Sequence, residues 1–428
     1  MNNFKTITLS LATLTALTLT GCGGSNSSTP TTATTPAPAA SVCDATLTVL
    51  DAVISSDLTL DASKTYGMEG KVNVKSGVTL TVPAGTTIAG CTPASFMVVE
   101  PGAKINAIGT QAKPIVFTSQ KDVLGQSAPN RAGEWGGLVL AGNAYTHYSN
   151  NKYEADESVL FGSTGHTHDG ESSGDLEYVL IKHSGYEVEK DKELNGLSLA
   201  GVGSGTTLKN IAIIGGLDDG VEIWGGRVNI DGLYVYNAQD DSVDTDLGYR
   251  GTIQNVLVRQ VNVDKTNNHD SAGMEFGNDH NTIVTDDSNA TQPNMINYTA
   301  YIKGGGISLK DDAGVRLSNV KFISAKTTDT QEVFYRSADV VDTHAVHVDG
   351  ELCFKDTAVI LANDSTTYSA TNSKDASTTK TALTDWVTTP GIQMGASGSI
   401  NVDSTACSGV DEASIWKGKA GTNAPLEQ

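Results

Sequence analysis

Two neighbouring stretches with one shared pattern decide the fold: LDDGVEIWGG at residues 217–226 and QDDSVDTDLG at residues 239–248. Asp218 and Asp240 stand 22 residues apart, and the residues after them keep that spacing. A period of this length is one coil of a parallel β-helix, whose coils stack because no coil can bury its apolar face alone. The repeat therefore predicts a β-solenoid.

The segments around these acidic turns have the pattern of short strands. Apolar residues recur between glycine-bearing or polar turns at residues 72–88, 96–108, 208–214, 228–235, 252–258, 306–309 and 315–322. Alternation with a period of two is typical of strands. We therefore predict an all-β fold, a right-handed parallel β-helix of about 22-residue coils with inserted loops, over residues 43–410, followed by a C-terminal tail at 411–428.

The N-terminus has the features of an export signal. A basic start with Lys5 precedes an apolar, hydroxyl-rich run at residues 7–19. This run is shorter than the roughly 20 apolar residues of a membrane-spanning helix. We expect residues 1–21 to be a signal peptide that is removed on export.

The sequence LTGC at residues 19–22 resembles the lipobox of bacterial lipoproteins, in which the chain is cut before the cysteine and the cysteine is acylated. This resemblance implies a lipid on Cys22 that anchors the protein to the outer membrane or cell surface. Residues 22–42 are rich in Ser, Thr and Pro and are expected to form a flexible tether. The alternative is an ordinary secreted protein with a stray cysteine.

The remaining cysteines, Cys43, Cys91, Cys353 and Cys407, are an even number in a chain with an export signal. They are therefore predicted to form two disulfides. Four cysteines allow three pairings, and proximity in sequence favours Cys43 with Cys91 and Cys353 with Cys407. None has the spacing of a zinc or redox site.

The charge of the chain limits its partners. Against 28 Lys and Arg stand 49 Asp and Glu, which gives a formal net charge of -21. Such a surface repels nucleic acid and anionic lipid, so we expect no nucleic-acid partner. The same charge favours divalent cations.

Three stretches interrupt the repeat, at residues 143–175, 262–300 and 362–390. Insertions into a solenoid project as loops and often gather on a binding face. The first contains His166 and His168, a weak candidate for a transition-metal site because alternating histidines in a loop are more often plain polar surface.

Side chains alternate between the faces of a strand, so Glu222 and Trp224 should point outward if Val221 and Ile223 point inward. Asp244 and Asp246 would face outward in the next coil, with Glu275 as the following member of the column. The candidate metal ligands are Asp218, Asp219, Glu222, Asp240, Asp241, Asp244, Asp246 and Glu275.

Carboxylates about 5 Å apart repel by roughly 1 kcal/mol per pair in water and by more where water is excluded. Ca²⁺, with its flexible shell of oxygen ligands, would offset this repulsion. Arg227 or Arg250 could offset it instead, as could protonation of one carboxyl group. The acidic residues could also serve only as tight-turn formers.

Five motifs resemble a family of right-handed β-helix, pectate-lyase-like surface lipoproteins of Gram-negative bacteria, over about residues 70 to 325. They are LTVPAGTTI (80–88), GTQAKPIVFTS (109–119), GEWGG (133–137), DDGVEIWGG (218–226) and DDSVDTDLGYRG (240–251). The resemblance implies the fold and a surface location, and it implies no particular activity.

Three classes of function remain open. A binding module would use exposed Trp224, Tyr249 and Arg250, together with Ca²⁺, to hold an extracellular polysaccharide or a surface protein. A Ca²⁺-dependent polysaccharide lyase would need a base such as Arg250 or Lys209, and a glycoside hydrolase would need two flanking carboxylates. A purely structural surface protein would need none of these, and no catalytic residue can be assigned.

Overall fold

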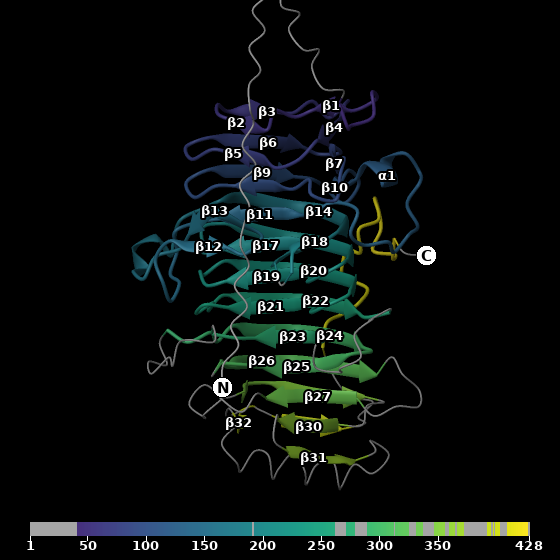
Figure 1. Ribbon diagram of the computed structural model, residues 1–428. Helices are drawn as coiled ribbons and strands as arrows, with labels where there is room; N and C mark the ends of the chain where they lie inside the picture. Colours follow the sequence, from purple (N-terminus) through teal and green to yellow (C-terminus); the bar gives the residue numbers. More distant parts are fainter. Residues whose placement is uncertain are drawn as a thin grey trace, which may run out of the picture. The chain divides into compact units, whose positions relative to one another are not determined.

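The computed structural model describes residues 41–426 apart from short gaps at 191, 262–270, 279–288, 312, 325–330, 337–345, 356–358, 364–365, 372–391, 395–396, 398 and 403–408. This part of the chain is almost entirely β, which confirms the predicted fold class. Figure 1 shows its strands stacked in successive coils from purple to green. Two long sheets run along the stack.

The first sheet forms one face of every coil. Its pairings are parallel except at the last strand, where β30 and β31 are antiparallel. Its strands are β2 (Val53–Ile54), β5 (Val72–Val74), β8 (Met97–Val99), β11 (Leu138–Ala141), β17 (Leu197–Ala200), β19 (Val221–Trp224), β21 (Val243–Asp246), β23 (Ala272–Phe276), β25 (Gly305–Leu309), β27 (Gln331–Arg336), β30 (Val359–Asn363) and β31 (Thr366–Thr371).

The second sheet is parallel throughout its described pairings. Its strands are β1 (Thr48–Val49), β3 (Leu58–Thr59), β4 (Thr65–Met68), β6 (Thr79–Pro83), β7 (Thr87–Gly90), β9 (Lys104–Ile108), β10 (Ile115–Ser119), β14 (Gly174–Ser184), β18 (Thr207–Gly216), β20 (Asn229–Ala238), β22 (Thr252–Arg259), β24 (Asn294–Ile302), β26 (Val315–Ser324), β28 (Val346–Val348), β29 (Glu351–Lys355), β32 (Ile392–Met394) and β33 (Ser399–Val402).

A bend inside each long strand makes this sheet into two faces of the coil. The first half of β14 pairs with β9 and its second half with β10. Asn210, Asn255, Asn297 and Asn319 adopt left-handed backbone conformations at the bend. The amides of the last three form a ladder: Asn297 donates to Asn255 at 3.1 Å and Asn319 to Asn297 at 3.2 Å. Asparagine tolerates this conformation and satisfies its side chain locally.

Apolar side chains fill the interior of the coils as one continuous cluster from Leu50 to Phe354. The register carries the 22-residue repeat directly, because Val221 pairs with Val243 across β19 and β21. Trp135 of the GEWGG motif is fully buried, and its indole N–H donates to the Lys182 carbonyl at 2.6 Å.

Two antiparallel hairpins leave the solenoid next to the first sheet. One is formed by β12 (Asn151–Tyr153) and β13 (Asp156–Phe161), within the predicted insertion at 143–175, and the other by β15 (Tyr186–Glu189) and β16 (Lys192–Leu194). The described helices are α1 (Gln120–Val123) and the 3-10 turn η1 (His166–His168). No helix in the described ranges is long and apolar enough to cross a membrane.

Cys43 and Cys91 form a disulfide, as predicted. Cys353 is also disulfide-bonded. Cys407 lies outside the described residues, so its pairing with Cys353 stays a prediction. Cys22, the signal peptide and most of the tether also lie outside them.

Candidate metal centre

A row of acidic side chains crosses three adjacent strands of the first sheet, β19, β21 and β23. Glu222 pairs in register with Asp244, and Asp244 pairs with Glu275. Val221 and Ile223, on either side of Glu222, belong to the apolar core. Alternation along the strand therefore points the carboxylates away from the core, and the predicted column with Glu275 as its next member is confirmed.

A second column lies three residues earlier, at the turn before each strand. Asn195 Oδ1 accepts the backbone N–H of Asp219 at 3.2 Å. Asp219 Oδ1 accepts that of Asp241 at 2.8 Å, and Asp241 in turn accepts that of Ala272. Each side chain therefore ties its own coil to the next one.

Asn195 shows that this bond between coils does not require a charge. Its neutral amide accepts the same kind of hydrogen bond that Asp219 and Asp241 accept in the next two coils. The bond between coils accounts for one side-chain oxygen of each aspartate. It does not account for the choice of an acidic residue, where a neutral asparagine would make the same bond beside fewer negative charges. The negative charge needs a second explanation.

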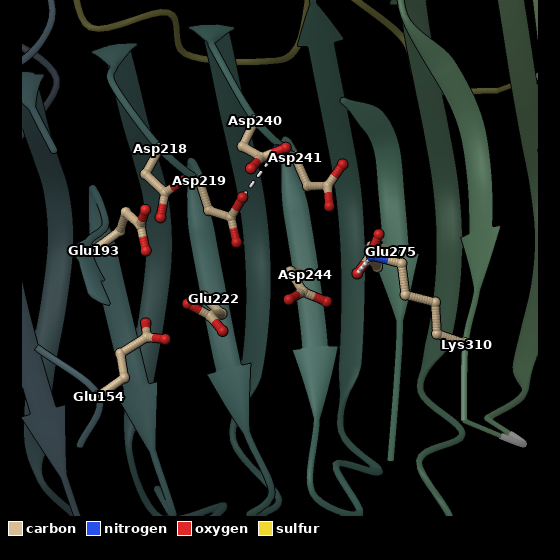
Figure 2. Close-up of a pocket in the computed structure, with 10 residues that line it drawn as sticks. All are labelled: Glu154, Glu193, Asp218, Asp219, Glu222, Asp240, Asp241, Asp244, Glu275 and Lys310. Carbon is tan, nitrogen blue, oxygen red and sulfur yellow. Dashed lines mark hydrogen bonds and ion pairs between the residues drawn. The ribbon is translucent and has the colours of Figure 1, made fainter. Parts of the chain in front are cut away.

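The two columns line a cavity of about 330 Å³ on the outer side of the first sheet. Figure 2 shows nine carboxylates and one amino group around it. The lining residues are Glu154, Glu193, Asp218, Asp219, Glu222, Asp240, Asp241, Asp244, Glu275 and Lys310. We call this cavity the acidic pocket.

The inserted hairpins bring two of these carboxylates to the pocket. Glu154 sits in the turn between β12 and β13, and Glu193 belongs to β16. The β12–β13 hairpin is held to the solenoid by Lys71, whose amino group lies 2.6 Å from Asp156, and by Tyr153, whose ring packs edge-on against Trp224. The β12–β13 hairpin therefore packs over the end of β19 beside the acidic row, where Asp219 and Glu222 are buried.

Burial, and after it the neighbouring carboxylates, raises the pKa of the inner acidic groups. The pKa values of Asp219, Glu222, Asp241 and Asp244 lie well above their ordinary range. Burial likewise raises the pKa of Glu154 to about 7, although its hydrogen bond with Glu222 acts in the opposite direction. Without a cation, these shifts favour the protonated form of the inner carboxyl groups.

The cation that reaches the acidic row is Lys310, the residue after β25. Its amino group lies 2.5 Å from Glu275 Oε1. Although burial alone would lower it, the pKa of Lys310 is raised by Glu275, Asp241 and Asp244. The other oxygen, Glu275 Oε2, is buried and has no hydrogen-bond partner.

The alternative that Arg227 or Arg250 offsets the acidic charge does not fit the structure. Arg227 bonds to the carbonyls of Gly226 and Gly248 and faces Asp169 at 3.4 Å. Arg250 donates to the carbonyl of Ala290 and to Gln292. Neither arginine lines the acidic pocket, because both follow the far end of their strand.

Two sets of carboxylates have oxygens close enough together to hold one ion each. Asp218, Asp219 and Asp240 form the first set, and Asp219, Glu222 and Asp244 form the second. Within each set the oxygens lie within 4.8 Å of one another. Asp219 belongs to both sets and would bridge two ion positions.

Seven of the eight predicted metal ligands line the pocket, and Asp246 does not. Asp246 pairs with Trp224, two residues beyond the acidic row, and Asp246 Oδ1 accepts the N–H of Leu247 at 2.6 Å. The two histidines of η1 lie elsewhere, where each ring faces a carboxylate: His166 faces Asp169 and His168 faces Glu171.

The predicted exposure of Trp224 and Tyr249 is wrong. Trp224 does point away from the core, but the β12–β13 hairpin covers it and leaves the residue 8% exposed. Tyr249 turns inward at the corner after β21, is fully buried, and donates to the Val228 carbonyl at 2.8 Å. Neither ring is open to a ligand.

The other base proposed for a lyase, Lys209, lies on β18 in the second sheet. It lines a separate cavity of about 440 Å³, together with Asp231 and Gln254, its partners in register. No described contact places Lys209 beside the acidic pocket, so the two halves of a lyase site are not brought together.

Glu154, Glu193 and Lys310 line the pocket but are not among the predicted ligands. The two glutamates lie in insertions, which carry no repeat from which a position could be read. The position of Lys310 follows from the alignment of two strands. Ser308 pairs with Glu275 and Leu309 with Phe276, so Lys310 lies one residue past the end of β23, in the next coil. A long side chain at that position can reach back by one coil.

Comparison with known proteins gives one match. The model of a family described as pectate-lyase like beta helix domain matches residues 52–395. No curated protein and no solved structure matches the chain.

Proposed function

The chain belongs to the family of pectate-lyase-like β-helix domains, and on that premise we propose that it is a surface module that binds Ca²⁺ in the acidic pocket. The observation that supports the proposal concerns Asp219 and Asp241. Each accepts a backbone N–H of the next coil, as the neutral side chain of Asn195 also does, but each places a carboxyl group in a buried position. A bound cation explains that charge, and turn geometry does not.

The donor set is one that suits Ca²⁺. All the acidic groups offer carboxylate oxygens, which hard divalent cations prefer, and Ca²⁺ accepts six to eight oxygens in an irregular arrangement. Asp219, whose Oδ1 holds the next coil, belongs to both sets of carboxylates that could hold an ion. Glu275 contributes a buried oxygen without a hydrogen-bond partner, which costs free energy unless a cation or proton meets it.

Calorimetric titration of the metal-free protein with CaCl₂ tests this function. Asp244→Asn removes a charge from the middle of the acidic row and should weaken binding at least about tenfold, as the loss of a charged ligand implies. Glu177→Gln, which removes the same charge on the second sheet, should bind as the parent protein does. If the parent protein releases no heat and binds no ion, the proposal fails.

The proposed setting of this module is the cell surface. Residues 1–21 direct export, acylated Cys22 anchors the chain, and residues 22–42 hold the solenoid away from the membrane. Replacing Cys22 with serine should move the protein from the membrane fraction to the soluble fraction of cells. An unchanged distribution would contradict the lipid anchor.

The proposed ligand of the module is an extracellular glycan or a surface protein. Because the pocket is lined by charged side chains, its acidic groups would take part in ligand binding through bound Ca²⁺. Binding to a panel of extracellular polysaccharides and surface-protein extracts should therefore require Ca²⁺ and be lost in Asp244→Asn. Equal binding in EDTA and in CaCl₂ would show that the ligand does not bind through Ca²⁺ in the acidic pocket.

One observation favours a hydrolase as a second candidate. Glu154 and Glu222 share a hydrogen bond, and the pKa of Glu154 is about 7, which suits a general acid or base. A hydrolase predicts new reducing ends from some polysaccharide, and Glu154→Gln should abolish them. If no member of a broad substrate panel yields product, this candidate is eliminated.

A further inference from the structure

Lys310 places an amino group inside the acidic pocket. Its backbone N–H donates to the Phe276 carbonyl at 2.8 Å, which fixes the residue one coil beyond the acidic row. Its side chain is 34% exposed and reaches back to Glu275, where the amino group lies 2.5 Å from Oε1. The ion pair therefore closes one end of the pocket (Figure 2).

We propose that Lys310 is a built-in competitor of the metal: its ammonium group occupies the Glu275 end of the pocket and limits both the number of divalent ions and their affinity. This inference rests on the proposed Ca²⁺ function and adds the residue that regulates it.

The surroundings of Glu275 are those of a cation position that the Lys310 ammonium group already fills. Neither set of metal-competent carboxylates includes Glu275, although its backbone pairs with Asp244 in the same row. One of its oxygens is held by Lys310, while the other is buried without a hydrogen-bond partner on a residue only 8% exposed. Half of this carboxylate is thus available for a cation, and the ammonium group takes the other half.

The Lys310 ammonium group also lies within electrostatic range of the carboxylates that would bind a metal ion. Lys310 is attracted by Asp241 and Asp244 as well as by Glu275. Asp244 belongs to one of the two metal-competent sets. A divalent ion bound there would be repelled by the ammonium group, and more strongly than in bulk water because the neighbouring carboxylates Asp241 and Glu275 are buried. Lys310 therefore lowers the affinity that the carboxylates alone would have.

The test compares Lys310→Met with Lys209→Met in the full-length chain, with Ca²⁺ alone as the probe. Lys209 lies on the other sheet, outside the acidic pocket, so its variant makes the same change in net charge. Calorimetry should show that Lys310→Met binds Ca²⁺ at least about tenfold more tightly than Lys209→Met or takes up one more ion. Lys310→Arg, which keeps the charge, should bind as the parent protein does.

The outcomes separate this inference from the proposed function. If the parent protein binds Ca²⁺ and Lys310→Met matches Lys209→Met in affinity and stoichiometry, the inference fails and the function stands. If only Lys310→Met binds, Lys310 is the resident cation, the inference holds and the proposed function fails. If neither binds, both fail.

Lys310→Met leaves Glu275 unpaired and could unfold the metal-free protein. The double variant Glu275→Gln with Lys310→Met removes both charges and avoids that problem. It should bind Ca²⁺ more tightly than Glu275→Gln alone, because repulsion of the ion by the Lys310 ammonium group at Asp241 and Asp244 is gone. A double variant no tighter than Glu275→Gln alone overturns the inference.

Discussion

At the scale of single residues, Asp219 and Asp241 serve the fold and a ligand with different oxygens. Oδ1 of each holds the backbone of the following coil, as the neutral amide of Asn195 does one coil earlier. The charge is therefore unfavourable for the metal-free protein and favourable only with a cation. A role in the turn requires only the oxygen that accepts the N–H, whereas a role in metal binding requires the negative charge as well.

Asp241→Asn and Asp241→Ala should have opposite effects in EDTA. The amide keeps the acceptor for the Ala272 N–H and removes repulsion from Glu275 and Asp244, so unfolding should require about 1 kcal/mol more. Alanine leaves that N–H without its acceptor and should lower the free energy of unfolding by about 1–3 kcal/mol. Urea unfolding followed by circular dichroism measures both, and an Asn variant less stable than the parent would contradict this interpretation.

At the scale of elements, the repeat was sufficient to predict the coil strands and the acidic row. A register that places Val221 beside Val243 follows from a 22-residue period, and it aligns Glu222 with Asp244. Glu275 lies more than one period further along the chain, and its place beside Asp244 was predicted from its own strand after an insertion. The hairpins could not be predicted in the same way, because a fold back onto the sheet depends on tertiary contacts. The prediction that Trp224 lies on the outer face was therefore correct, whereas the prediction that it is exposed was wrong, because the unpredicted hairpin covers it.

The C-terminal segment is a second element whose position the repeat could not predict. Residues after 410 were expected to form a tail, but Ile415 and Trp416 pack on the outer face of β14, β18, β20 and β22, against residues such as Leu180 and Tyr234. The buried amino group of Lys417 donates to three backbone carbonyls of the same segment and holds its shape.

Trp416→Ala should lower the free energy of unfolding by about 3–5 kcal/mol, because the residue is 2% exposed and its removal opens a cavity between the segment and the sheet. Trp416→Phe should cost less, since it keeps most of the contact. Chemical unfolding of both variants measures the difference. An alanine variant as stable as the parent would show that the segment does not stabilise the solenoid.

At the scale of the whole molecule, the acidic pocket reverses the usual pH dependence of carboxylates. Burial and neighbouring charges raise the pKa of these groups, so the metal-free folded state binds more protons than the unfolded state, whose carboxyl groups titrate near pH 4. Stability in EDTA should therefore rise as the pH falls from 8 to 5. Asp122 has a lowered pKa, because its contact with His183 and its hydrogen bonds from Lys182 and Thr118 outweigh its burial, so its contribution is lost only below that window.

Urea midpoints at pH 8 and pH 5.5 measure this dependence. In EDTA the midpoint should be higher at pH 5.5, and in millimolar CaCl₂ the difference should shrink or reverse, because protons then compete with the ion. The double variant Asp219→Asn with Asp241→Asn should lose much of the EDTA effect. A midpoint in EDTA that falls on acidification would show that the pocket is not proton-bound.

The central claim, that the acidic pocket is completed by Ca²⁺, is tested most directly by thermal unfolding in EDTA and in millimolar CaCl₂, with the disulfides intact. An ion at a hundred times its dissociation constant adds about 2.7 kcal/mol to the free energy of unfolding. We predict a higher melting temperature in CaCl₂ for the parent protein, and a much smaller rise for the Asp219→Asn, Asp241→Asn double variant. Equal melting temperatures of the parent protein in both solutions would contradict the claim.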